Sequence, residues 1–125
     1  MKVRYIRPGD VLDDDEQVVA RGGDLDAQVV RAYAQRMSSV YGVYGISVFA
    51  LRGVSLDELA QQPPLIRFAE LALVTVGTIR AAGLHLEPTG RNPRHFTIVL
   101  PDVTSGVEAL CACDRLLWNN AYHVP

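Results

Sequence analysis

The densest group of chemically active side chains lies in the stretch Gly90-Arg91-Asn92-Pro93-Arg94-His95-Phe96-Thr97. Guanidinium groups bind phosphate or carboxylate oxygens bidentately, and a histidine beside them can act as a general acid or base near pH 7. Arg91, Arg94 and His95 are therefore predicted to be catalytic residues of phosphoester chemistry, and Asn92 is predicted to contact the substrate. The alternative is a solvated hairpin loop in which His95 only opens a strand.

The chain end, residues 118–125, is rich in hydrogen-bonding and aromatic groups, whereas most chain ends consist of small polar residues. If this tail folds back over the site, His123 is a second candidate acid or base. Asn119, Asn120 and Tyr122 are then candidate substrate-binding residues. The alternative is that the aromatic rings of the tail close one end of the core.

One short pattern resembles a phosphoesterase signature. His95-Phe96-Thr97-Ile98 resembles one half of the His-x-Thr-hydrophobic signature of the two-histidine phosphoesterases, whose paired motifs face each other across a cleft. The second half is missing, because Glu87 stands where that family has threonine after the other strand histidine, His85. The resemblance covers four residues and implies phosphoester chemistry at His95.

A second pattern resembles enzymes that use NAD. Glu87-Pro88-Thr89-Gly90 is similar to a tetrapeptide of the rifampin ADP-ribosyltransferases. Arg4 on an expected first strand and Ser47 on an expected central strand are similar to the wider transferase pattern, although the sequence assigns no position to its glutamate. This resemblance implies an NAD-using transferase with Arg4 as a substrate-binding residue.

Cysteines and acidic residues form no pattern typical of a metal site. Cys111 and Cys113 lie in an expected helix, so their side chains diverge by about 200° and no second ligand pair accompanies them. The run Asp13-Asp14-Asp15-Glu16 lacks the alternating ligands and the glycine of a calcium loop. We expect neither a metal ion nor a cofactor, because Gly-rich phosphate cradles and nucleophile elbows are also missing.

The charge distribution confines any nucleic-acid contact to a local patch. The formal net charge is −2, with seven acids against four bases in residues 1–26 and eight bases against seven acids in residues 27–125. A domain-wide basic field is therefore lacking. The charged N-terminus does not fit a signal peptide, and no run approaches the roughly 18 apolar residues of a membrane span, so we expect a cytoplasmic protein without membrane contact.

The candidate residues must be positioned by helices and strands, and the expected pattern of these elements predicts a single α+β domain over residues 1–125. We expect a small mixed or mainly antiparallel sheet packed by about two to four helices. A strand ending at Val76 is expected to lead into a short helix that Gly83 stops. The other expected strands are 2–7, 18–20, 46–51, 84–87 and 95–100.

Three helices are expected from caps and periodicity. The first follows a cap at Asp24, and its apolar stripe is predicted to bury the residues Leu25, Val29, Tyr33 and Met37. The second is short, begins at the capping box Ser55-Leu56-Asp57-Glu58 and ends at Pro63-Pro64. The third runs from Thr104 through Leu117 and is apolar around most of its circumference, so the fold, a protein partner or a second copy must cover it.

The leading functional prediction is a small RNA-directed effector, a metal-independent endoribonuclease toxin of a bacterial toxin-antitoxin pair. Its ligand would be RNA or another phosphate-bearing molecule. The alternative is a non-catalytic protein-interaction module, favoured by the apolar last helix and the aromatic-glycine stretch at residues 41–45. A third hypothesis is the NAD-using ADP-ribosyltransferase.

Overall fold

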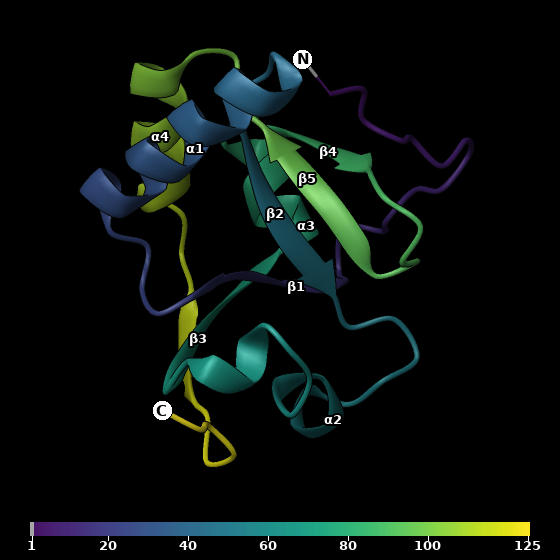
Figure 1. Cartoon of the computed structure of the whole chain (residues 1–125), viewed down its shortest axis with the longest axis vertical. Helices are drawn as coiled ribbons and strands as arrows, with labels where there is room; N and C mark the ends of the chain where they lie inside the picture. Colours follow the sequence, from purple (N-terminus) through teal and green to yellow (C-terminus); the bar gives the residue numbers. More distant parts are fainter. Residues whose placement is uncertain (1) are drawn as a thin grey trace.

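The computed structural model describes residues 2–125, which form one six-stranded antiparallel sheet with helices packed on it (Figure 1). The strand order is β4-β5-β2-β1-β3-β6. The strands are β1 (Gln17–Gly22), β2 (Gly45–Ala50), β3 (Glu70–Thr75), β4 (His85–Pro88), β5 (His95–Val99) and β6 (Leu116–Asn119). The helices are α1 (Ala27–Tyr41), α2 (Leu56–Ala60), α3 (Val76–Ala81) and α4 (Val103–Cys111), with a 3₁₀ turn at Leu65–Arg67. The expected α+β class is confirmed.

Each face of the sheet has its own apolar cluster. Alternation along β1 puts Val18 and Ala20 on one face and Val19 on the other. The larger cluster packs β2 and β5 against Val30 and Ala34 of α1 and against α4. The smaller cluster covers the other face with residues of α2, the 3₁₀ turn and β3. The two layers hold the strands rigidly where they are paired.

The sheet opens between β1 and β2, its two central strands. Their ladder joins Val18 to Ala50 and Val19 to Phe49, and among residues 2–125 no further pair follows. Each strand continues instead with its outer neighbour, β1 with β3 and β2 with β5. The two strands therefore run apart, with α1 beside β2 (Figure 1). Beyond the two pairs, the backbone N–H and C=O groups of β1 and β2 therefore point into the space between the strands and do not bond to each other.

The first helix begins later than the sequence indicated. Asp26, not Asp24, is its N-cap, and its side chain accepts a hydrogen bond from the amide of Val29 at 3.1 Å. The buried stripe consequently falls on Val30 and Ala34, while Val29 is 44% exposed. The prediction that Val29 is buried is therefore wrong, because adjacent helix positions point about 100° apart.

The N-terminal segment is irregular. Residues 2–7 form no strand, and Ile6 makes an isolated bridge to Thr89. The amide of Arg7 donates to the carbonyl of Pro88 at 2.8 Å, and the amide of Gly90 donates to Tyr5 at 2.9 Å. The expected first strand is thus wrong, although its backbone does run beside the end of β4.

The last helix is shorter than expected. It ends at Cys111, so Cys113 lies outside it, and Leu116 and Leu117 belong to β6. These two leucines pair with residues 72 and 73 of β3. If the helix continued instead, the backbone groups at this edge of β3 would have no strand to bond to. The apolar circumference expected for one helix therefore divides between a buried helix and an exposed edge strand.

Several local expectations are confirmed. Ser55 accepts a hydrogen bond from the amide of Glu58 at 3.1 Å and starts α2. The strand β3 leads directly into α3, and Gly83 follows with a φ of 82°, a left-handed conformation that glycine adopts readily. The strands β4 and β5 form the expected antiparallel pair. Among residues 2–125, no helix has the length and apolar character needed to cross a bilayer.

Candidate functional site

Two adjoining cavities lie where the sheet opens. The first, here the sheet cavity, has a volume of about 280 Å³, and its lining includes Arg21, Gly22, Tyr33, Ser47, Phe49 and Phe68. The second, here the histidine cavity, has a volume of about 360 Å³, and its lining includes Arg4, Tyr5, Tyr41, Ser47, Arg91 and His95. Ser47 lines both, so the two cavities meet at the middle of β2.

Strand register determines which side chains face the histidine cavity. Ser47 of β2 lies opposite Thr97 of β5, and Thr97 lies opposite Glu87 of β4. His95 lies opposite Phe49, and their rings meet edge to face with centroids 5.5 Å apart. Because alternate residues share a face, the hydroxyl and imidazole groups of Ser47, Thr97 and His95 line the histidine cavity together, whereas Glu87 lines a different cavity.

The proton on His95 can be assigned from its hydrogen bonds. Its Nδ1 lies 3.0 Å from the backbone carbonyl of Thr89 and 2.9 Å from the Thr89 hydroxyl, which lies 2.7 Å from the hydroxyl of Thr97. A carbonyl oxygen only accepts, so the proton is assigned to Nδ1. In the neutral ring Nε2 then carries the free lone pair, which is the form of a general base.

The environment of His95 favours this neutral form. Burial holds the pKa of His95 below its ordinary value, the hydrogen bond to the Thr89 carbonyl opposes the shift, and the charge of Arg7 adds to it. The imidazole is therefore unprotonated at neutral pH. It can accept a proton from a reacting group without first losing one.

Arg7 holds the loop that carries His95. Its guanidinium donates to the carbonyls of Thr89 at 2.6 Å, Gly90 at 2.9 Å and His95 at 2.9 Å, and to Pro93 at 3.3 Å. The same group pairs with Asp10 and lies 5.1 Å from the centroid of the Phe96 ring. One arginine thus joins both ends of the loop and sets the position of the imidazole.

Some of the predicted loop residues line the histidine cavity and others point away from it. Arg91 and His95 line the histidine cavity together, and Arg4 joins them there. Arg94 does not line it, because its Nε donates to the carbonyl of Arg52 at 3.1 Å. Asn92 shapes the loop, since its side-chain oxygen accepts from the amide of Arg94 at 2.9 Å. The expected common surface therefore holds two of the three loop residues predicted to be catalytic.

The C-terminal tail lies away from this site. It follows β6, which is the sheet edge opposite β4, and so Asn119 and His123 are not brought to His95. The hydroxyl of Tyr122 donates to Asp57 at 3.0 Å. Asn120 is buried, and its amide donates to the carbonyls of Ala60, Leu65 and Phe68. Trp118 packs against the smaller core cluster, as the alternative expects, whereas Tyr122 is 38% exposed and does not close the core.

Sequence reasoning missed Arg7 and Arg21. Arg7 follows no recognisable pattern, because the carbonyls that it binds lie 82 to 88 residues away. Arg21 lies just outside the strand expected at residues 18–20, but β1 extends to Gly22 and Arg21 lines the sheet cavity. Its position at the end of an apolar run and before Gly22 was the available signal.

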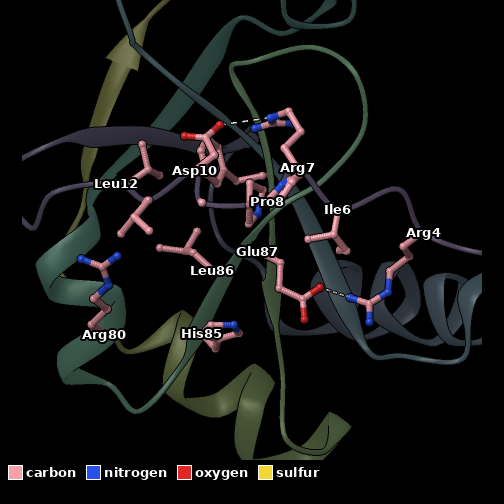
Figure 2. Close-up of a pocket in the computed structure, with 14 residues that line it drawn as sticks. Arg4, Ile6, Arg7, Pro8, Asp10, Leu12, Arg80, His85, Leu86 and Glu87 are labelled. Carbon is pink, nitrogen blue, oxygen red and sulfur yellow. Dashed lines mark hydrogen bonds and ion pairs between the residues drawn. The ribbon is translucent and has the colours of Figure 1, made fainter.

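A further cavity of about 520 Å³ lies between the N-terminal segment, β4 and α3 (Figure 2). All three arginines of its lining are ion-paired, in Arg4–Glu87, Arg7–Asp10 and Arg80–Asp14. Figure 2 shows the first two of these pairs along the N-terminal segment. Its cations are thus already neutralised, whereas Arg21 and Arg91 make no ion pair among residues 2–125. The histidine and sheet cavities are the stronger candidate site.

No three His, Cys, Asp or Glu side chains among residues 2–125 lie close enough together to hold a metal ion. Comparison of the chain with protein-family models, with curated proteins and with solved structures yields no match in any of the three.

Proposed function

We propose that this protein binds a nicotinamide dinucleotide in the sheet cavity and transfers its ADP-ribosyl group, with His95 as proton acceptor. The observation that carries the proposal is the divergence of β1 and β2, which brings Arg21 and Ser47 to the walls of one cavity. The resemblance to the transferase pattern required an arginine on a first strand and a serine on a central strand. Arg21 replaces Arg4 as that arginine, because residues 2–7 form no strand.

The cavity offers each kind of contact that such a ligand needs. Unpaired backbone edges of the two strands can take up the donor and acceptor of a carboxamide, as a neighbouring strand would. Arg21 supplies a guanidinium for the diphosphate. Phe49 and Phe68 supply aromatic surface for flat rings. With the adjoining histidine cavity, the volume falls in the range of roughly 300–1,000 Å³ typical of small-molecule sites.

Each bond broken, each bond formed and the transferred proton can be assigned in this reaction. The bond between C1′ of the ribose and the nicotinamide nitrogen breaks, and its electron pair neutralises the pyridinium charge. An acceptor oxygen or nitrogen forms the new bond to C1′, and its proton passes to Nε2 of His95. Ser47 lies where the two cavities meet and can donate a hydrogen bond to the ribose. No oxidation or reduction occurs.

The test is titration of the purified chain with NAD⁺ by calorimetry, followed by chromatography of released nicotinamide. Arg21→Ala is expected to weaken NAD⁺ binding about tenfold or more, since a charged hydrogen bond is worth about 1.5–3 kcal/mol. His95→Ala is expected to slow transfer by about 10² to 10⁴. Arg31→Ala, an exposed change on α1, is the matched control and should alter neither. Absence of NAD⁺ binding at millimolar concentration by the wild-type chain would refute the proposal.

A second candidate function is metal-independent cleavage of RNA, and the pairing of neutral His95 with Arg91 in one cavity favours it. His95 would take the proton of a ribose 2′-hydroxyl, the 2′-oxygen would bond to phosphorus, and the bond from phosphorus to the 5′-oxygen would break. The 5′-oxygen would be protonated by water, and Arg91 would stabilise the phosphorane charge. Shortened RNA in the absence of NAD⁺ would support this function over transfer.

Both activities fit a bacterial toxin acting in the cytoplasm. Induced expression should then arrest growth, and the double variant His95→Ala with Arg91→Ala should relieve the arrest. Growth arrest that persists in that variant, at equal protein level, would favour the non-catalytic interaction module.

A further inference from the structure

We propose that the acceptor in this reaction is a single-stranded nucleic acid, bound across the histidine cavity and the adjoining face of α1. The transfer step rests on the proposed function, but the binding surface stands on separate observations. We define this acceptor surface by Tyr5, Arg91, Tyr33, Arg36 and Tyr41.

Two arginine-tyrosine pairs form the acceptor surface. The guanidinium of Arg91 lies 5.5 Å from the centroid of the Tyr5 ring, and that of Arg36 lies 5.8 Å from the centroid of the Tyr33 ring. Tyr5 is 54% exposed, so its ring remains accessible to a ligand. Alternating aromatic rings and guanidinium groups are the arrangement that stacks bases and holds phosphates.

The two pairs belong to one continuous hollow. Tyr5 and Arg91 line the histidine cavity, while Tyr33 and Arg36 line a groove of about 180 Å³ along α1. Tyr41 lines both, so the groove opens into the cavity that contains His95. A ligand lying in this hollow would extend past the proton acceptor.

The charge of the acceptor surface suits a polyanion. Arg91 and Arg36 make no ion pair among residues 2–125, so both charges remain available to phosphates. The nearest carboxylate of the strand pair, Glu87, is neutralised by Arg4. On a chain with a net charge of −2, attraction is therefore local to this surface.

The position of the proton acceptor inside a cavity favours a single strand over a duplex as the ligand. Thr97 is buried and His95 is half-buried in the lining of the cavity, and the reacting atom of the donor would lie beside Ser47. A base within a duplex cannot reach such a position without leaving its stack, whereas an unpaired base, whose amino or ring N–H carries the proton to be removed, can enter directly. The acceptor atom loses its proton to Nε2 of His95 as its bond to C1′ forms.

The test measures fluorescence anisotropy of labelled 12-nucleotide single-stranded RNA and DNA and of the matching duplex, without NAD⁺. Single strands are expected to bind at least tenfold more tightly than the duplex or polyglutamate. Tyr5→Ala should weaken single-strand binding about tenfold, the loss of one stacked base. Arg91→Ala should weaken it and reduce the slope of log affinity against log salt by about 0.7, the loss of one phosphate contact.

Arg31→Ala is the control, because this arginine lies on α1 outside the acceptor surface. Its affinity for the single strand should match that of the wild type. Equal binding of duplex and single strand, or unchanged affinity in both Tyr5→Ala and Arg91→Ala, would overturn the inference. Parallel titration of the wild type with NAD⁺ reports separately on the donor site, so failure of one proposal is distinguished from failure of the other.

Discussion

Replacing Arg7 with methionine should loosen the His95 loop and destabilise the whole protein. Methionine keeps an apolar stem against the Phe96 ring but removes every donor. Three well-formed bonds to carbonyls disappear, at 2.6, 2.9 and 2.9 Å, together with one at 3.3 Å and the ion pair to Asp10. Asp10 keeps Arg52 as a partner, so its carboxylate is not left unpaired.

The expected cost is at least about 3 kcal/mol, because each of the three well-formed bonds contributes at least about 1 kcal/mol and the long one is counted as nothing. For a chain of this length that corresponds to a fall in Tm of about 10 °C. Urea unfolding followed by circular dichroism measures the free energy. The matched control is Arg31→Met, an exposed change on α1 that should stay within about 0.5 kcal/mol of wild type.

A second measurement distinguishes the loss of the hydrogen bonds between Arg7 and the His95 loop from general destabilisation. Burial and, to a smaller extent, the charge of Arg7 lower the pKa of His95. Arg7→Met should therefore raise the pKa of His95 toward its ordinary value, as measured by NMR titration of the imidazole. A variant with wild-type stability and an unchanged His95 pKa would show that Arg7 does not hold the loop.

Three further predictions test the packing and the titration of His95. Val30→Asp should cost at least about 3 kcal/mol because it buries an unpaired carboxylate, whereas Val29→Asp should cost under about 1 kcal/mol, and equal costs in urea unfolding would contradict the observed α1 register. Gly106→Ala should destabilise by about 1–3 kcal/mol despite better helix propensity, because a Cβ there would lie 2.6 Å from the Cβ of Leu100, and a higher Tm would refute this packing. Because burial lowers the pKa of His95 in the folded state, the unfolded state takes up its proton first, and stability should fall as pH drops below about 6.5. His95→Gln should lack that component of the pH profile, and a profile identical to wild type would contradict it.

The sequence alone determined the features that depend on neighbouring residues. The capping box at Ser55, the glycine stop at Gly83 and the antiparallel pair around the 89–94 loop all follow from side chains within a few positions of one another. Residues 46–51 are apolar on both faces apart from Ser47, and this run correctly predicted that β2 is a central strand. The loop containing Arg91 and His95 was found because its residue types are unusual, not because their geometry was visible.

The tertiary structure decided which of these residues meet. Arg7 contacts carbonyls more than 80 residues away, and no periodicity records such a contact. Leu116 and Leu117 continue the apolar pattern that predicted a helix, but pairing with the free edge of β3 makes them a strand. The opening between β1 and β2 arises because each strand continues its ladder with a different neighbour, and that choice is made by the packing of the whole sheet. This opening places Arg21 and Ser47 in one cavity, and Ser47 also lines the adjoining cavity that contains His95, so the candidate site is created there.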